Sequence, residues 1–361
     1  MTLLSDILPF PSWNNQLHSD FLTIAGPCSV ESEEQVLQTA RKIRELTDVQ
    51  VFRAGVWKPR TRPDSFEGVG EKAFPWLKKV KQKYGFLIAC EVATSQHVEK
   101  GLANGIDIFW IGARTTPNPF AVNEIAEAFR GVDVPVMVKN PVNPDFGLWL
   151  GAIERLYKLG IHKLAAVHRG FFPFEQTKLR NIPKWEMAIE LKSECPDIPL
   201  IADPSHMAGN IKYVENLAQK ALDLNYNGLM IETHINPLVA KSDAKQQLTP
   251  EQLHKLLTNL IFKQSKVSRD NKNSIIENYR DQIDSIDYQM LELLAQRMEV
   301  VRKIGVYKKE HKVTIFQLRR WIEILQTRGD FAKKTNLSPD FVKQVMRLIH
   351  KESIRQQTDN G

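Results

Sequence analysis

The feature that most constrains this chain is an alternation of short apolar runs and amphipathic stretches before about residue 260. The apolar runs are rich in β-branched residues and predict strands, and the stretches between them repeat apolar residues at helical spacing. Strands that alternate with helices pair in parallel through crossover connections. The eight runs are Leu22–Ala25, Val49–Arg53, Phe86–Cys90, Ile108–Ile111, Val134–Val138, Lys163–Val167, Pro199–Ala202 and Gly228–Ile231.

Eight strand–helix units in about 250 residues predict an α/β fold of the (β/α)8 TIM-barrel type. The clearest intervening helical stretches are 33–46, 71–83 and 148–159. An open doubly wound sheet is the alternative, but it would need a G-x-G-x-x-G first turn. The first turn here reads Gly26-Pro27-Cys28-Ser29, so the barrel is favoured.

The pattern changes near residue 270, which predicts a second domain. Of the 19 prolines, only Pro339 lies beyond that point. The polar segment 263–273 resembles a linker between a barrel at 1–262 and a helical domain at 274–361. Apolar residues then recur every three or four positions to about residue 309, as expected of a helix about 50 Å long. Shorter helical patterns follow at Phe316–Thr327 and Pro339–Gln357.

A helix of that length cannot be covered by about 90 residues alone, so we expect a separate all-α three-helix domain that forms an intertwined dimer. Homo-oligomerisation, at least to a dimer, is therefore expected. Three scattered cysteines, no signal-peptide pattern and no long apolar run favour a cytoplasmic enzyme without a membrane partner. The net charge of +7 could suit a nucleic acid, but the cations stand singly and not in a basic stripe. We expect anionic small molecules as partners and no nucleic acid.

Four residues near the predicted strand ends are of types that bind metal ions. Cys28 follows the first strand, His206 the seventh and Glu232 the eighth, and Asp243 lies in the loop beyond. The catalytic groups of TIM barrels gather at the C-terminal ends of the strands, so these residues are expected to meet. One thiolate, one imidazole and two carboxylates suit a divalent Mn, Fe, Co or Zn ion, which can polarise an aldehyde carbonyl.

The same strand ends carry single cations. Phosphate and carboxylate groups are bound by such guanidinium forks and ammonium charges, and two phosphorylated substrates would use them all. The predicted set is Arg53, Lys58, Arg60, Arg114, Lys139 and Arg169.

Five motifs, in order over residues 20–260, resemble the short form of 3-deoxy-D-arabino-heptulosonate 7-phosphate (DAHP) synthase. They are Gly26-Pro27-Cys28-Ser29, Lys58-Pro59-Arg60-Thr61, Ile111-Gly112-Ala113-Arg114, Asp203-Pro204-Ser205-His206 and Ser242-Asp243-Ala244-Lys245-Gln246. The resemblance implies that phosphoenolpyruvate and erythrose 4-phosphate condense to DAHP and phosphate, the first step of the shikimate pathway.

The resemblance also implies roles for single residues. The metal ligands would be Cys28, His206, Glu232 and Asp243. The phosphoenolpyruvate cradle would be Arg53, Lys58, Arg114, Lys139 and Arg169, with Lys58 also catalytic. Arg60 and Thr61 would hold erythrose 4-phosphate, with Arg60 on its phosphate.

Two positions depart from the family pattern: Arg62 stands where Ser or Thr is common, and Lys139 is followed by Asn140-Pro141. Neither departure removes a cation. The alternative is 3-deoxy-D-manno-octulosonate 8-phosphate synthase, which takes arabinose 5-phosphate, joined to a helical domain without catalysis. The Lys-Pro-Arg-Thr motif favours the four-carbon sugar.

The tail, at 275–358, resembles the all-helical (type II) chorismate mutases in the pattern Arg280-Asp281-Gln282-Ile283-Asp284-Ser285-Ile286-Asp287. The resemblance implies Claisen rearrangement of chorismate to prephenate, which needs a compact conformer and donors on the ether oxygen. The implied site residues are Arg280 (in the partner subunit's site), Arg297, Lys308, Arg320, Ser353 and Gln357. Lys308 and Gln357 would donate hydrogen bonds to the ether oxygen of chorismate.

Gln317 and Trp321 stand where the mutase family has acidic residues, and Trp cannot accept a hydrogen bond. A degenerate dimerisation or regulatory module is therefore the alternative to an active mutase. Because the barrel would act upstream of chorismate and the tail would consume it, we also expect ligands of the tail to regulate the barrel.

Overall fold

The computed structural model describes residues 4–59, 64–173, 177–263 and 272–359. The chain divides into two compact units, Met1–Ser265 and Lys266–Gly361, which are described separately below. The predicted residues Arg60 and Thr61 lie outside the described part of the chain.

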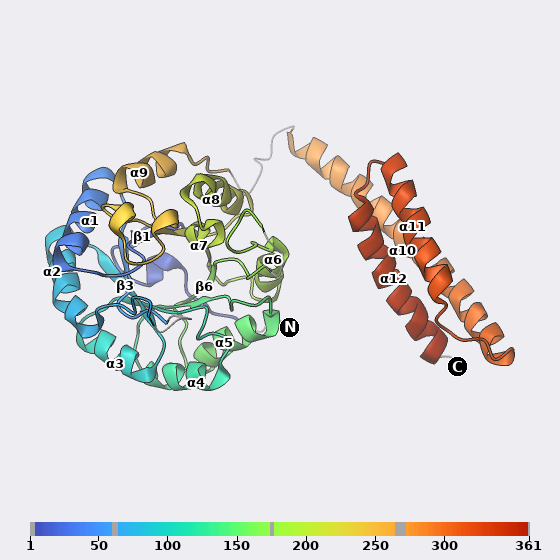
Figure 1. Cartoon of the computed structure of the whole chain (residues 1–361), viewed down its shortest axis with the longest axis horizontal. Helices are drawn as coiled ribbons and strands as arrows, with labels where there is room; N and C mark the ends of the chain where they lie inside the picture. The colour runs from blue at the N-terminus through green and yellow to red at the C-terminus, as the bar shows by residue number, and fades with distance from the viewer. Residues whose placement is uncertain (1–3, 60–63, 174–176, 264–271, 360–361) are drawn as a thin grey trace. The chain divides into compact units, whose positions relative to one another are not determined.

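The first unit is a closed barrel of eight parallel strands in chain order, which confirms the predicted fold (Figure 1). The barrel closes between β1 and β8, from Leu22 opposite Gly228 to Gly26 opposite Glu232. The strands are β1 (Leu22–Gly26), β2 (Val51–Ala54), β3 (Leu87–Val92), β4 (Ile108–Ile111), β5 (Val136–Lys139), β6 (Leu164–His168), β7 (Leu200–Ala202) and β8 (Gly228–Glu232).

Each predicted strand is present, with ends displaced by two residues or fewer. The predicted helix at 71–83 is instead a 3-10 turn, η2 (Gly70–Ala73), followed by α2 (Phe74–Tyr84). Pro75 explains the break, because proline has no N–H to donate to the preceding turn.

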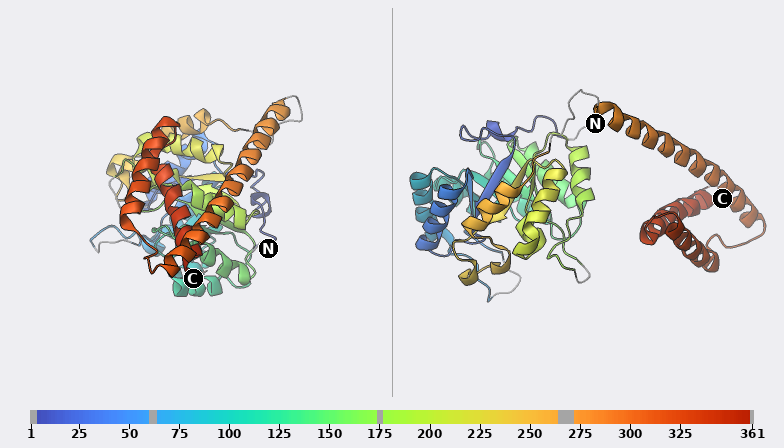
Figure 2. Two further views of the ribbon diagram at one scale, coloured as in Figure 1. Left: turned by 90° about the vertical axis from the view of Figure 1, so that its right-hand side faces the viewer. Right: turned by 90° about the horizontal axis from the view of Figure 1, so that it is seen from above.

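Helices surround the strands as a ring (Figures 1 and 2). Side chains of Ser32, Thr94, Asn118, Asp145 and Thr249 cap helix N-termini, which satisfies otherwise unpaired N–H groups. The remaining helices of this unit are α1 (Glu33–Leu46), α3 (Ser95–Ala103), α4 (Pro119–Ala128), α5 (Phe146–Lys158), α6 (Trp185–Glu194), α7 (Pro204–Ala208), α8 (Val214–Asp223) and α9 (Pro250–Asn259). Short 3-10 turns complete the unit: η1 (Phe10–Ser12), η3 (Ile211–Tyr213), η4 (Pro237–Val239) and η5 (Ala244–Gln246).

The unit has two layers of buried apolar residues. One layer lies between strands and helices. The other fills the barrel interior and includes Ile24, Val51, Trp110 and Met230. Trp110 is fully buried, and its ring centroid lies 5.3 Å from the Arg53 guanidinium carbon. The interior is therefore a packed base beneath the charged residues at the strand ends.

The second unit contains α10 (Lys272–Glu310), α11 (Leu318–Lys334) and α12 (Pro339–Asp359). Helix α12 packs against both α10 and α11. Helix α11 starts two residues later and ends seven residues later than its apolar pattern predicts, because packing against α12 supports its last turns around buried Gly329. Within the described residues, no helix is long and apolar enough to cross a membrane.

Candidate active site

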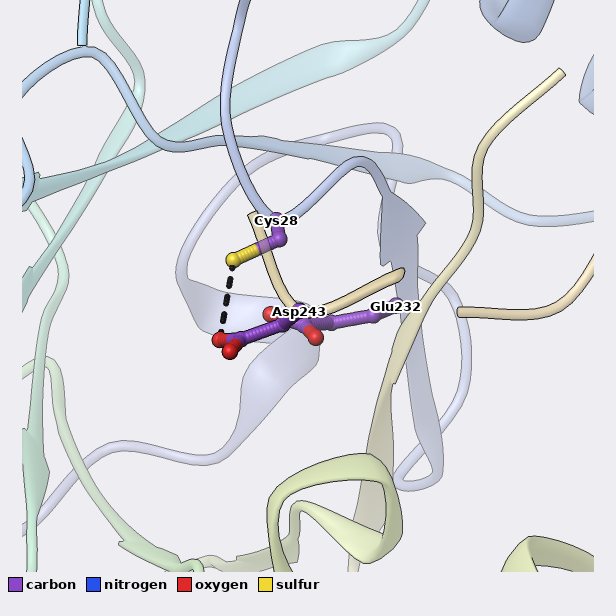
Figure 3. A group of neighbouring side chains, drawn as sticks. All are labelled: Cys28, Glu232 and Asp243. Carbon is purple, nitrogen blue, oxygen red and sulfur yellow. Dashed lines mark hydrogen bonds between the residues drawn. The ribbon is translucent and has the colours of Figure 1, made fainter. Parts of the chain in front are cut away.

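Three of the four predicted metal ligands meet at the C-terminal mouth of the barrel. The ligand atoms of Cys28, Glu232 and Asp243 all lie within 4.8 Å of one another (Figure 3). Cys28 Sγ is 3.3 Å from Asp243 Oδ2. Cys28 closely follows the end of β1, and Glu232 is the last residue of β8, so the pairing of β1 with β8 brings these two residues together. One thiol and two carboxylates are donors that suit a borderline divalent ion.

The fourth predicted ligand, His206, lies beside this cluster. Its Nε2 is 3.6 Å from Glu232 Oε1, and its Nδ1 is 2.8 Å from Asp203 Oδ2. Asp203 also caps α7 by accepting from the His206 backbone N–H at 3.2 Å, which holds the two residues together. A carboxylate on one ring nitrogen is the usual way to direct the other nitrogen to a metal. Burial lowers the pKa of His206, which favours the neutral, metal-binding imidazole.

Arginines balance the charge of the two carboxylates. Arg53 Nη2 donates to Glu232 Oε1 at 3.0 Å, and both side chains are 0% exposed. Arg180 Nη1 donates to Asp243 Oδ1 at 2.9 Å. Burial alone would raise the pKa of Asp243, but Arg180 and other nearby cations hold it well below its ordinary value. Burial, reinforced by Glu232, raises the pKa of the Cys28 thiol to about 12.

The predicted phosphate-binding cations also reach this mouth. The cleft is lined by Lys58, Glu91, Arg114, Lys139, Arg169, Arg180, His206 and Asp243, among others. Lys139 Nζ donates to Asp203 Oδ2 at 2.7 Å, and Lys58 Nζ lies 3.9 Å from Glu91 Oε2. Burial lowers the pKa of Arg169 to about 10, so its side chain stays cationic near neutral pH.

Arg53 retains unused hydrogen-bonding capacity. Its Nε and Nη1 atoms are buried and have no hydrogen-bond partner among the described residues. Buried donors without partners are costly, and they are common where a ligand completes the site. Two nitrogens of one guanidinium with free N–H groups fit a carboxylate or phosphate ligand.

Four residues of this mouth were missed as site residues by sequence reasoning: Glu91, Asp203, Arg180 and Gln246. Glu91 and Asp203 directly follow predicted strands, so their position was the available signal. Gln246 Nε2 donates to Glu232 Oε2 at 2.7 Å and lies at the end of the Ser242–Gln246 motif. Arg180 lies in an irregular segment after β6, where no sequence period points to it.

Residues 17–268 match the sequence model of the DAHP synthetase I family. The chain belongs to the DAHP synthetase I family. A relative from Thermotoga maritima, phospho-2-dehydro-3-deoxyheptonate aldolase, is 33% identical over 237 residues, which are 66% of this chain and 68% of the relative. A crystal structure of the T. maritima enzyme (DAHP synthase) aligns with a TM-score of 0.59 at 32% identity, covering 66% of this chain and 67% of that one. A 2-dehydro-3-deoxyphosphooctonate aldolase from Wolinella succinogenes is 25% identical over 260 residues, 66% of this chain and 98% of that protein.

Residues 279–358 match the sequence model of type II chorismate mutase. The T-protein of Enterobacter agglomerans is 35% identical over 82 residues, which are 23% of this chain and 22% of that protein. The chain therefore carries a DAHP synthase domain followed by a type II chorismate mutase domain, as the two sets of motifs predicted.

The chorismate mutase domain gathers part of its predicted site. Arg297 Nη1 donates to Ser353 Oγ at 2.6 Å, and Gln357 Nε2 donates to the Ser353 backbone oxygen at 3.1 Å. Lys308 Nζ donates to the Ile315 backbone oxygen at 2.6 Å. Burial lowers the pKa of both Arg297 and Lys308.

Two predicted residues of this domain stand apart from that group. Arg280 precedes Arg297 by 17 positions on the continuous helix α10, a rise of about 26 Å, so one chain does not bring them together. Arg320 pairs instead with Glu323 at 2.7 Å on exposed α11. Trp321, one of the departures from the family pattern, stacks on His350 with ring centroids 4.1 Å apart.

Proposed function

We propose that the barrel condenses phosphoenolpyruvate with erythrose 4-phosphate to DAHP and phosphate, and that the helical domain rearranges chorismate to prephenate. The observation that carries the first activity is one mouth that combines a thiol–imidazole–carboxylate cluster with several cations. A doubly charged phosphorylated acid and a phosphorylated aldehyde are substrates of the right chemistry for such a mouth.

Arg53 is the first anchor for phosphoenolpyruvate, because its two unpartnered nitrogens, Nε and Nη1, need an anionic acceptor. Lys139 and Arg169 add charge from the neighbouring strands β5 and β6, and Arg114 adds an exposed cation at the rim. On binding, the anionic groups of phosphoenolpyruvate would replace their hydrogen bonds to water with hydrogen bonds to these cations. Because the cations are fixed in place, they would orient the C3 carbon toward the aldehyde. Arg60 and Thr61 remain the predicted ligands of erythrose 4-phosphate.

The donor set fits a divalent Mn, Fe, Co or Zn ion held by Cys28, His206, Glu232 and Asp243. The fit rests on the Cys28, Glu232 and Asp243 ligand atoms within 4.8 Å of one another and on the Nε2 of His206, which lies 3.6 Å from Glu232 Oε1. When bound, such an ion would supply Lewis acidity to the aldehyde carbonyl.

The bonds then change as follows. The C3 carbon of phosphoenolpyruvate attacks the aldehyde carbon, water adds at C2, and phosphate leaves from C2. Burial alone would lower the pKa of Lys58, but neighbouring Cys28 and Glu91 raise it, so Lys58 stays an ammonium. Lys58 is therefore suited to donate a proton to the oxygen that was the aldehyde carbonyl.

The first activity is tested by mixing the full chain with phosphoenolpyruvate and erythrose 4-phosphate, with and without a chelator. Loss of phosphoenolpyruvate that stops on chelation and returns with a divalent ion is expected. Turnover with arabinose 5-phosphate alone would assign the barrel to the octulosonate reaction. No turnover of either sugar by metal-loaded protein would refute the proposal.

The second activity rests on Arg297, Ser353 and Gln357, which lie together on α10 and α12. Chorismate carries two carboxylates, so Arg297 and Lys308 would hold the compact conformer while donors act on the ether oxygen. Conversion of chorismate to prephenate by the full chain tests this, with Arg297→Ala as the loss-of-function variant. A wild-type rate equal to the uncatalysed rate would leave only a dimerisation or regulatory role.

We further propose that the helical domain forms a dimer. A stripe along α10 leaves large apolar side chains exposed: Ile276, Tyr279, Ile283, Ile286, Met290 and Leu293. Their three- and four-residue spacing suits a second helix, and a contiguous exposed stripe of this kind marks an interaction surface. It would also bring Arg280 into the partner's mutase site. Light scattering should show a dimer or larger species, lost in Ile283→Glu and retained in the control Leu238→Glu, which alters an exposed leucine of the barrel.

Feedback between the two activities is the last proposal. Because prephenate is the product of the second domain and lies downstream of DAHP, its binding would lower the synthase rate by shifting a conformational equilibrium. A synthase rate unchanged at saturating prephenate would refute this. The three buried, unpaired cysteines suit a reducing compartment, so we place the enzyme in the cytoplasm.

A further inference from the structure

Arg180 lies at the barrel mouth without belonging to the predicted cradle or the predicted ligand set. A single nitrogen, Nη1, donates to Asp243 Oδ1 at 2.9 Å and to Gln246 Oε1 at 2.8 Å. Gln246 in turn donates from Nε2 to Glu232 Oε2 at 2.7 Å. Arg180 therefore connects to both carboxylates of the cluster, directly to one and through a buried amide to the other.

These bonds select one oxygen of each carboxylate. On Asp243 they occupy Oδ1 and leave Oδ2, which lies 3.3 Å from Cys28 Sγ. On Glu232 they occupy Oε2, while Oε1 accepts from Arg53 Nη2 at 3.0 Å and lies 3.6 Å from His206 Nε2. The oxygens that Arg180 and Gln246 do not bond are thus the ones that lie nearest to Cys28 and His206.

The backbone of Arg180 is held by α7, the helix that carries His206. The Arg180 N–H donates to the Ala208 oxygen at 3.2 Å, and the Asn181 side chain donates to the His206 oxygen at 2.6 Å. Gly209 ends α7 with φ +67°, and a Cβ there would lie 2.5 Å from Arg180 Cβ. The Arg180 backbone is therefore fixed relative to α7, although its side chain is 39% exposed.

We propose that Arg180, acting with Gln246, is a positioning residue that fixes the orientation of Asp243 and Glu232 for metal binding. This rests on the metal site proposed above. Three potentially anionic groups within 4.8 Å repel one another, and Asp243 lies in a loop at φ +47° with no regular structure to hold it. Outer hydrogen bonds of this kind orient metal ligands, and their loss typically lowers metal affinity about 10- to 100-fold.

The competing role for Arg180 is a direct contact with a substrate phosphate, since its side chain also lines the cleft. The two roles predict different measurements. A positioning role changes metal affinity in the absence of substrate, whereas a phosphate contact changes substrate KM at saturating metal.

The test is titration of metal-free full chain with Co²⁺, following the thiolate-to-cobalt absorption of Cys28 and, by chelator competition, the Kd. Arg180→Gln should raise the Kd about 10- to 100-fold, and Arg180→Lys should restore part of the affinity. Gln246→Leu should raise the Kd as well, and the double variant should lose less than the product of the two single effects. Lys178→Gln is the matched control, because it removes one positive charge from the same segment at an exposed side chain.

The outcomes separate this inference from the metal site itself. A wild-type chain that gives no Cys28-dependent cobalt signal would remove the proposed site. A normal wild-type signal with an Arg180→Gln Kd within twofold of wild type, or with a raised substrate KM alone, would overturn only the positioning role. Unchanged thermal unfolding of the metal-free variants would exclude a folding defect as the cause.

Discussion

The ion pair between Arg53 and Glu232 makes a strong prediction for the stability of the barrel. The two side chains are 3.0 Å apart and 0% exposed. Arg53→Met keeps most of the side-chain volume but leaves the Glu232 carboxylate buried without its arginine. The remaining donor in contact, Gln246, is neutral and bonds the other oxygen. We therefore expect the variant to be destabilised well beyond the loss of one ordinary hydrogen bond.

The magnitude follows from the burial. Removing one partner of a buried ion pair costs about 3–5 kcal/mol, because the other charge stays desolvated. At about 2–4 °C per kcal/mol for a domain of this size, the Tm should fall by about 6–20 °C. Arg53→Met/Glu232→Gln removes both charges, so it should recover most of that loss.

The assay is thermal unfolding of the full chain in a chelator, followed by tryptophan fluorescence. Trp321 is the one tryptophan of the helical unit, so the signal reports mainly on the barrel. Arg130→Met is the control, since Arg130 pairs with Glu127 at the surface and should leave the Tm unchanged within error. A Tm of Arg53→Met equal to that of the control, or a double variant no more stable than the single one, would refute the reasoning.

Three further predictions follow from other parts of the molecule. Burial lowers the pKa of His168 to about 3, so between about pH 6.5 and that value the unfolded chain binds a proton that the folded one does not. The free energy of unfolding should fall with decreasing pH over that window, with a contribution from His168 of up to about 1.4 kcal/mol per pH unit. His168→Gln should reduce this pH dependence when unfolding by denaturant is measured at several pH values. An unchanged pH dependence would contradict the lowered pKa of His168. Ser353→Ala should lower kcat/KM for chorismate roughly 10-fold or more, because the Arg297 guanidinium loses its hydrogen bond to Ser353. Synthase activity should not change, and the exposed control Ser285→Ala should keep the wild-type mutase rate. Equal mutase rates for the two variants would contradict this role of Ser353. Gly26→Ala should unfold at lower temperature and lose synthase activity. Gly26 has φ +145°, and a Cβ at this position would lie 2.3 Å from the backbone oxygen of Arg53 in β2. A wild-type Tm for this variant would contradict the predicted strain.

Local patterns in the sequence were sufficient for the elements of the fold. The eight strands follow from short apolar runs and the long C-terminal helix from the spacing of its apolar residues, which are patterns among near neighbours in the chain. The metal-type residues could be proposed for the same reason: each follows a predicted strand, and all parallel strands of a barrel end at one mouth. Helix ends were less well predicted, as α11 shows, because packing against α12 and not spacing decides where that helix stops.

What the sequence determined by itself was therefore the fold class, the order of elements and the residue types delivered to the mouth. Only the tertiary structure decided which side chains meet there. The Arg53–Glu232 pair spans 179 positions and the Arg180–Asp243 pair spans 63, and neither partner of the second pair lies in a strand or a long helix. Loop residues have no period to reveal their direction, so their partners are set when β8 closes on β1 and α7 fixes the segment that carries Arg180.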